Sequence, residues 1–256
     1  MFPLLFIGKI GLINMANSTY LQLVNKVLVL MNEVQLSESN FDDAIGIYQA
    51  VKNAVNSSIN DINSAEYEWP FNFTQTFQTL TVGQVLYSLP ADVKVVDWES
   101  FYVNNDGTLN LSTRNLERIN KEEWEKKYKE KDFDNTTSGI GLPDFVFPYG
   151  SNQFGISQAS DQAYTVKYNY YKIPTQLSVA TDTTDIPDTW DYVIVAGALW
   201  YGNLFKSDEN TADRIEKKYI TARDNMRSIL INRPENVNSN MIIKTYSNGA
   251  PSVKTY

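Results

Sequence analysis

The sequence predicts an α+β protein in which N- and C-terminal helices form one helical bundle and an antiparallel β-rich domain is inserted between them. Helical periodicity opens the chain from Thr19 to Glu66, strand-type alternation follows, and an apolar, aromatic-rich helical pattern returns between Asp188 and Pro234. With 256 residues, of which 43% are hydrophobic, the chain can bury a substantial core. We therefore expect one helical module that is split by an insertion.

The expected boundaries follow these changes of pattern. The helical module is expected in two parts, residues 15–68 and residues 187–233. The β-rich domain is expected between them, over residues 69–186. An apolar leader over residues 1–14 precedes them, and an extended tail over residues 234–256 follows. The chain is thus expected to hold one domain or two closely joined ones.

The leader is shorter than the about 20 residues that a membrane-spanning helix needs. Its first basic residue is Lys9, inside the apolar run, so it lacks the charged start of a secretion signal. Met15 begins a second, more ordinary N-terminal sequence. We expect the leader to be a translated upstream extension or a docking arm, and a secretion signal is the less favoured alternative.

The first two expected helices form an αα-hairpin. Over residues 19–34, apolar residues recur at steps of three and four, and side-chain oxygens are available to cap the first turn. A second helix is expected from Ser39, a capping residue that precedes the acidic Asp42, to about Glu66. Pro70 then ends helical propensity, because proline cannot continue the hydrogen-bond ladder.

The middle of the chain has the alternation of β-strands. One strand is expected at residues 71–77, where phenylalanines alternate with polar residues, and a hairpin turn is expected at Asn104-Asn105-Asp106-Gly107. In the last strand, Tyr164, Val166, Tyr168 and Tyr170 share one side, which favours sheet packing or a subunit contact over a stacking platform. The other expected strands cover residues 85–89, 95–103, 145–147 and 153–156.

A charged helix is expected near residues 120–132, inside the β-rich domain. Its lysines and its acidic residues balance, so we interpret it as a solvated helix anchored by Trp124 and Tyr128, not as a nucleic-acid surface. Residues 134–141 are expected to form a polar loop.

Two further helices are expected after Pro187. Asp188 is placed to cap the first of them, and the second runs over about residues 210–231 with Ile229 or Leu230 at the end of its apolar face. We expect the large apolar residues of the first helix to lie in subunit contacts; the alternative is that they complete the core of the single chain. These candidates are Trp200, Tyr201 and Phe205.

Composition excludes several kinds of chemistry. The chain has no cysteine and no histidine, which removes disulfides, thiolate nucleophiles, Cys/His zinc sites and every Ser-His or Cys-His relay. The formal net charge of −8 leaves no basic surplus for nonspecific nucleic-acid binding through the bulk surface. We expect no enzymatic activity, no catalytic residue, no metal and no cofactor. The weak catalytic candidates are Glu66 and the carboxylate pair Asp97 and Glu99, which share a strand face.

An ordered set of short motifs characterises the chain. It comprises Leu23-Val24-Asn25, Asn32-Glu33, Trp69-Pro70-Phe71, the turn from Tyr87 to Asp92, the strand end from Tyr170 to Pro174, Ile186-Pro187, and the final helix pair with Ala196-Gly197-Ala198-Leu199-Trp200. This succession resembles the head-to-tail adaptor proteins of short-tailed and crAss-like bacteriophages, akin to tail tubular protein A. The resemblance covers most of residues 17–232.

The resemblance implies a virion structural protein of the phage neck or tail, made in the host cytoplasm. It implies a ring, expected to be dodecameric, that binds the portal protein and the tail or nozzle proteins, lets genome DNA pass without sequence-specific binding, and has no membrane partner. The tail of the chain is expected to dock on the portal through Met241, Ile242, Ile243, Tyr246 and Tyr256. The alternatives are a tail-associated peptidoglycan-degrading enzyme and a receptor-binding or fibre-attachment module.

Overall fold

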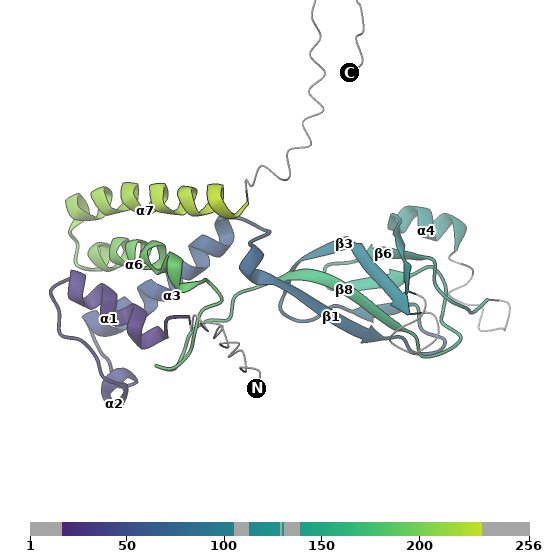
Figure 1. Ribbon diagram of the computed structural model, residues 1–256, viewed down its shortest axis with the longest axis horizontal. Coiled ribbons are helices and arrows are strands. Elements are labelled where there is room, and N and C mark those ends of the chain that lie inside the picture. The colour runs from purple at the N-terminus through teal and green to yellow at the C-terminus, as the bar shows by residue number, and fades with distance from the viewer. Residues whose placement is uncertain (1–16, 105–112, 129, 131–138, 232–256) are drawn as a thin grey trace, which may run out of the picture.

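The computed structural model describes residues 17–104, 113–128, 130 and 139–231. Most helices gather at one end of the long axis, and the strands lie at the other end together with one short helix (Figure 1). We call these the helical part and the sheet part. The mixed α+β class is confirmed.

The helical part brings together the two ends of the described chain. Helix α6 packs against α1, α3 and α7, and its apolar residues lie at the centre of one buried core. That core also holds Val24 and Val27 of α1 and Ile59 and Ile62 of α3. The helices are α1 (Tyr20–Leu30), α2 (Glu38–Phe41), α3 (Ile47–Ala65), α6 (Asp191–Phe205) and α7 (Glu209–Leu230).

Helix α1 begins as expected and ends early. Thr19 caps it in a reciprocal capping box with Gln22, whose side chain accepts a hydrogen bond from the Thr19 N–H. The helix was expected to continue to Val34, but Asn32 adopts a left-handed backbone with φ of +57°. The Glu33 N–H then donates to the Leu28 carbonyl at 2.9 Å, which closes the helix with a Schellman motif.

The single second helix that was expected from Ser39 to Glu66 is wrong, because the structure divides it. The short α2 is capped by Ser37, not by Ser39. Gly46 has φ of +61° and ψ of −126°, a backbone that only glycine adopts readily, and α3 starts immediately after it. The glycine therefore separates two helices that a helical pattern alone joins.

Two four-stranded sheets form the sheet part. Their strand orders are β1-β8-β3-β4 and β2-β7-β6-β5, and pairing is antiparallel except between β5 and β6, which are parallel. The strands are β1 (Phe73–Thr79), β2 (Leu86–Ser88), β3 (Val93–Asn104), β4 (Thr113–Asn115), β5 (Glu117–Arg118), β6 (Phe145–Tyr149), β7 (Gln153–Ile156) and β8 (Thr165–Lys172).

Aromatic side chains fill the second core, inside the sheet part. The Phe101 and Tyr168 rings stack with their centroids 4.5 Å apart, and Phe154 contacts both rings edge-on. The expected tyrosine side of β8 is buried in this core. The alternating phenylalanines expected in the first strand are not: Phe71 precedes the strand in a 3-10 turn, and Phe73 and Phe77 are exposed.

The charged helix expected near residues 120–132 is present as α4 (Lys121–Lys127). Trp124 anchors it: the indole stacks on Phe147 at 4.6 Å, and its N–H donates to the Ser157 carbonyl at 3.1 Å. Tyr128 ends α4, and residues 129 and 131–132 of the expected helix lie outside the described residues. Most of the loop over residues 134–141 and the turn after Asn104 also lie outside them.

Details of the last two helices differ from expectation. Asp188 does not cap α6; it begins a 3-10 turn, η2 (Asp188–Trp190), that leads into the helix. On α7, Leu230 packs against the core, whereas Ile229 is 58% exposed. Asp208 caps α7 by accepting a hydrogen bond from the Thr211 N–H at 3.1 Å.

Trp69 lies where the two parts meet. It is fully buried in the helical core, and its indole N–H donates to the Ile62 carbonyl at 2.7 Å. Lys94 of β3 donates to the carbonyls of Asn63 and Glu66 at the C-terminal end of α3. Burial lowers the pKa of Lys94, and the nearby Glu66 opposes this change. A buried indole and an ammonium group therefore connect the sheets to the helices.

Candidate interaction surface

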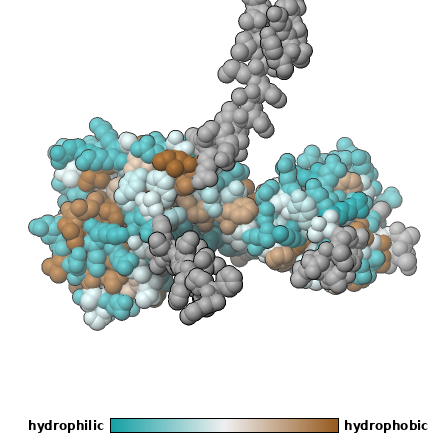
Figure 2. Space-filling model, viewed as in Figure 1, coloured by the Kyte–Doolittle hydropathy of each residue, from teal (hydrophilic) through white to brown (hydrophobic). Residues whose placement is uncertain are grey.

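Apolar side chains are exposed at the end of the helical part that faces away from the sheets, where brown residues gather in Figure 2. We call this the far-end surface and define it as Leu30, Val34, Leu204 and Phe205. Their exposed fractions run from 44% for Leu204 to 74% for Val34. An exposed apolar group of this kind is typical of a protein contact.

The far-end surface exists because α1 and α6 terminate side by side in the same way. Ser207, with φ of +59°, ends α6, and the Asp208 N–H donates to the Asn203 carbonyl at 3.1 Å. The Lys206 ammonium pairs with Glu33 at 2.8 Å across the two helix ends. A β-carbon on Gly202 would lie 3.0 Å from the Met31 sulfur, so the helices approach closely here.

The structure separates the three subunit-contact candidates of α6. Trp200 and Tyr201 are partly buried against the helical core; Trp200 lies 6.2 Å from Tyr219 between ring centroids. The Tyr201 hydroxyl donates to Asp61 at 2.6 Å, and burial, aided by the Asp61 charge, raises the pKa of Tyr201. Phe205 is 60% exposed and belongs to the far-end surface. Leu30 and Leu204 were not predicted, because the side-chain pattern does not show where α1 and α6 end.

A groove of about 930 Å³ runs between α1 and α6 and reaches the far-end surface at Leu30. At its base the Asp191 carboxylate, which is 6% exposed, pairs with the Lys26 ammonium at 2.5 Å and accepts a hydrogen bond from the Ser18 hydroxyl. Val29 and Tyr192 are the exposed apolar residues along it. In the sequence, the feature that could have predicted this buried ion pair is Asp191, an aspartate at the start of an otherwise apolar helix.

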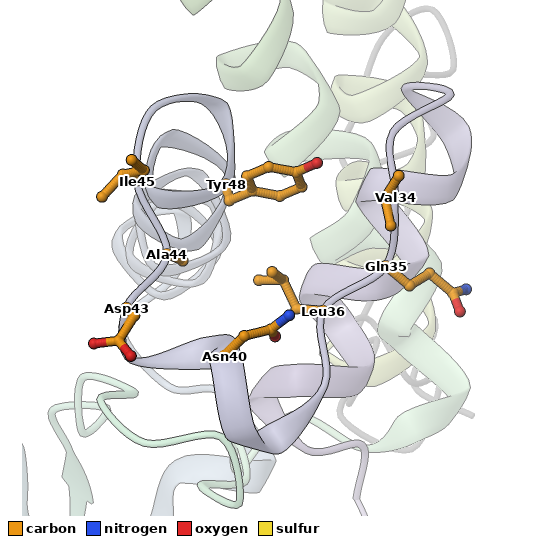
Figure 3. A pocket seen from close by; sticks show the side chains of 8 residues that line it. All are labelled: Val34, Gln35, Leu36, Asn40, Asp43, Ala44, Ile45 and Tyr48. Atoms are coloured by element: carbon orange, nitrogen blue, oxygen red, sulfur yellow. The ribbon is translucent and has the colours of Figure 1, made fainter.

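A smaller pocket of about 240 Å³ lies between the segment after α1 and the start of α3 (Figure 3). Val34 and Leu36 line one side, and Ala44, Ile45 and Tyr48 line the other. Asn25 fixes the first segment, since its side chain accepts from the Leu36 N–H and donates to the Leu36 carbonyl at 2.8 and 2.9 Å. The pocket extends the exposed apolar area from Val34 toward α3.

The weak catalytic candidates have structural partners. Glu66 pairs with Arg227 of α7 at 2.8 Å and accepts a hydrogen bond from the Tyr67 N–H. Asp97 accepts a hydrogen bond from the Glu99 N–H at 3.3 Å, where the pairing of β3 with β8 is irregular. The Glu66 contacts fix the end of α3, and the Asp97 contact fixes the irregular part of β3. This favours a structural role for Glu66 and for Asp97.

The described part of the chain shows neither a cluster of metal ligands nor a membrane-spanning helix. No group of three or more acidic side chains is arranged to hold a metal ion there. Among the described helices, none combines the length and the apolar character that crossing a membrane requires.

The model of the SU10 adaptor protein family matches residues 18–241, which include every described helix and strand. The chain belongs to the SU10 adaptor protein family. Among curated proteins, no sequence matches the chain. The resemblance to phage head-to-tail adaptors is thereby confirmed, and this SU10 adaptor protein family member is a structural adaptor component of a phage particle.

The expected portal-docking residues Met241, Ile242, Ile243, Tyr246 and Tyr256 lie outside the described residues. The family match reaches the first of them. Their role therefore stays a proposal.

Proposed function

We propose that this adaptor forms a ring, expected to be dodecameric, in the neck of the virion, where it joins the portal protein to the tail or nozzle proteins. The match to the SU10 adaptor protein family over residues 18–241 carries this proposal. The role is to connect, with no catalysed reaction. The exposed apolar surface at the end of the helical part supports it physically.

Ring assembly requires two different surfaces on each copy, because a cyclic arrangement places one face of a subunit against another face of its neighbour. The far-end surface is our candidate for one of them. Phe205 is its largest side chain, and burying a phenylalanine contributes about 1.5–3 kcal/mol. Trp200 and Tyr201 position this surface, because they pack against the core on the preceding turn of α6.

The genome is proposed to pass through the lumen of the ring. With a formal charge of −8, the chain has no basic surplus to neutralise phosphates. A lumen that attracted phosphate would hold DNA through counterion release and slow its passage. An acidic ring therefore suits a channel that DNA crosses without binding.

The tail of the chain is proposed to reach the portal. Residues 241–246 carry apolar side chains in a polar surrounding, a pattern that suits a segment that orders on a partner. Deleting residues 235–256 should abolish portal binding and leave the fold intact, with a cooperative thermal unfolding transition. Portal binding by the shortened chain would contradict this role of the tail.

Electron microscopy with mass determination tests the proposed function, on the chain alone and after mixing with the portal ring of the same phage. The expected result is a defined ring stacked on the portal. Failure to bind the portal in either state would count against the adaptor role.

One substitution tests the subunit contact separately. Phe205→Asp should prevent ring formation without unfolding the chain, because the side chain is exposed in the single copy. Ile229→Asp is the matched control, since Ile229 is exposed to a similar degree on α7 outside the far-end surface. A ring that persists in Phe205→Asp would exclude the far-end surface as the contact.

A further inference from the structure

Strand β1 is the longest of the strands that end a sheet in the described structure, and its outer edge is unpaired. β1 lies at the end of the order β1-β8-β3-β4, and seven consecutive residues pair with β8 without a bulge. The other edge strands, as far as the structure describes them, are β4 and β2 with three residues each and β5 with two. From Thr74 to Thr79, the structure records no backbone pairing with a described residue outside β8.

The composition of this edge offers no protection against further pairing. Natural edge strands are usually blocked by lysine, proline, a bulge or shortness. The sequence Phe-Thr-Gln-Thr-Phe-Gln-Thr contains no charge, no proline and no glycine, and its threonines and phenylalanines favour extended structure. Half of its backbone N–H and C=O groups point away from β8, as in any edge strand. The edge is therefore ready to accept another strand.

The C-terminal end of the described chain lies close to the start of β1. Arg227, in the last turn of α7, pairs with Glu66 at 2.8 Å, and the Ile231 N–H continues the helix by donating to the Arg227 carbonyl. Glu66 precedes Phe73 by seven residues, so the start of β1 lies at most about 25 Å away along the chain. The nine residues from 232 to 240 can span about 30 Å.

The segment that follows this connection has the composition of a strand. Residues 241–247 read Met-Ile-Ile-Lys-Thr-Tyr-Ser, with two isoleucines, a threonine and a tyrosine, and without proline or glycine. Both the edge and the segment are rich in β-forming residues, and they are seven residues long. A short connection within one chain also gives a high effective concentration, which favours the chain's own segment over a separate molecule.

We propose that residues 241–247 pair with the free edge of β1 of the same chain and add a fifth strand to its sheet. Backbone hydrogen bonds supply the pairing, and exposed Phe73 and Phe77 supply apolar contacts on the outer face. This pairing forms in the free chain. Only its consequence rests on the proposed function: a tail held on β1 must be released before it docks on the portal.

Hydrogen exchange of the full-length free chain, followed by mass spectrometry, tests this pairing. In Ile243→Pro, the proline removes a backbone donor from the segment, so the amides of residues 73–79 should exchange about tenfold faster or more. Ser252→Pro is the control with proline elsewhere in the tail, and it should leave this exchange unchanged. Equal exchange of residues 73–79 in the natural chain and in Ile243→Pro would overturn the proposal.

Cysteine pairs identify the occupant of the edge, because the natural chain has no cysteine. Gln75→Cys, on the exposed face of β1, is combined in turn with one cysteine at each position from 242 to 246. A strand on the edge should give disulfides at alternate positions and within single chains. Uniform yields along the segment would overturn strand pairing. Disulfides only between chains would assign the edge to the tail of a second copy and overturn the proposal as stated.

These outcomes are separable from the proposed function. The exchange and disulfide experiments use the free chain, whereas the adaptor role is tested by binding to the portal. A chain that binds the portal but shows no tail pairing would refute only the inference. A chain that shows tail pairing but never binds the portal would refute only the adaptor role.

Discussion

The helical part and the sheet part are built from the chain in different ways. The core of the sheet part comes from one continuous stretch between Leu80 and Tyr170. The core of the helical part joins both ends of the described chain, and Ser18 bonds to Asp191, 173 positions later. The sheet part can therefore complete its core from neighbouring sequence, whereas the helical part depends on residues that the whole insertion separates.

The two parts also differ in what they leave exposed. The helical part exposes apolar side chains at its far end, from helices that end in left-handed caps. The sheet part encloses most of its described aromatic residues; Phe73 and Phe77 on the outer face of β1 and Tyr102 of β3 are exposed. Contacts through side chains are thus expected at the helices, and contacts through the backbone at the edge of the sheet.

Alkaline pH is expected to have the largest effect on stability. It should also show which of the two parts unfolds first. Burial raises the pKa of Tyr219 in the helical part and of Tyr168 in the sheet part to about 12, with nearby acidic or phenolic groups as a smaller cause. The folded chain therefore holds these protons more tightly than the unfolded chain, in which tyrosine titrates near 10. Stability should be complete below about pH 10 and should fall as the pH rises toward 12.

Tyrosinate absorbance and circular dichroism, followed together, check the alkaline transition. Tyr219→Phe and Tyr168→Phe are the matched variants, and the one that shifts unfolding to higher pH marks the part that opens first. Ionisation of these buried tyrosines near pH 10 in a chain that keeps its circular dichroism would contradict the expectation.

Trp69→Ala is expected to have the next largest effect, because Trp69 belongs to the joint between the parts. Removing a fully buried indole should cost about 3–5 kcal/mol of unfolding free energy, and the Ile62 carbonyl would lose its donor. Denaturant unfolding measures the loss. Trp69→Phe, which keeps an aromatic ring but not the N–H, should cost less; equal losses would show that packing contributes little here.

One glycine in each core allows a matched comparison. A β-carbon on Gly155 of β7 would overlap the Phe147 ring, and one on Gly197 of α6 would overlap the Ser58 hydroxyl and lie 2.9 Å from Tyr219. Gly155→Ala should cost about 1–3 kcal/mol by overpacking. Gly197→Ala should cost less, because alanine gains about 1 kcal/mol of helix propensity. Thermal unfolding of both variants measures the difference, and the reverse order would contradict it.

The Arg227–Glu66 ion pair is expected to have the smallest effect on stability. Its arginine side chain is 55% exposed, so the pair should contribute about 0.2–1 kcal/mol. A double-mutant cycle with Arg227→Gln and Glu66→Gln isolates this interaction, and it should weaken with added salt. A coupling energy well above this range would show that the helix end is fixed more tightly than its exposure indicates.

Periodicity predicted most of the elements but not the places where the backbone turns. The face of α1 and the alternation of β8 follow from burial, which leaves a regular trace in the sequence. Gly46, Asn32 and Ser207 interrupt helices through left-handed or glycine-specific backbone, and a pattern of side chains does not record that conformation. The division of residues 38–65 into two helices was missed for this reason.

The interaction surface was less predictable than the fold. Phe205 was a candidate because it is a large apolar residue in an apolar helix, and it is exposed; the same reasoning included Trp200 and Tyr201, which pack against the core. The distinction depends on where α6 ends relative to α1. The exposure of Phe73 and Phe77 likewise depends on which face of β1 is turned to solvent, and alternation alone does not choose between the two faces.

The joint between the two parts has a mechanical consequence. Two backbone segments cross it, one after α3 through Trp69 and one from β8 back to Asp188, and each is covalently continuous. A force that pulls the sheets away from the helices therefore acts on two connecting segments at once, not on a single linker. Lys94 of β3 donates hydrogen bonds to carbonyls at the end of α3. This contact lies beside the two connecting segments and opposes rotation of one part against the other. Separating or twisting the two parts would therefore load two covalent connections and one hydrogen-bonded contact.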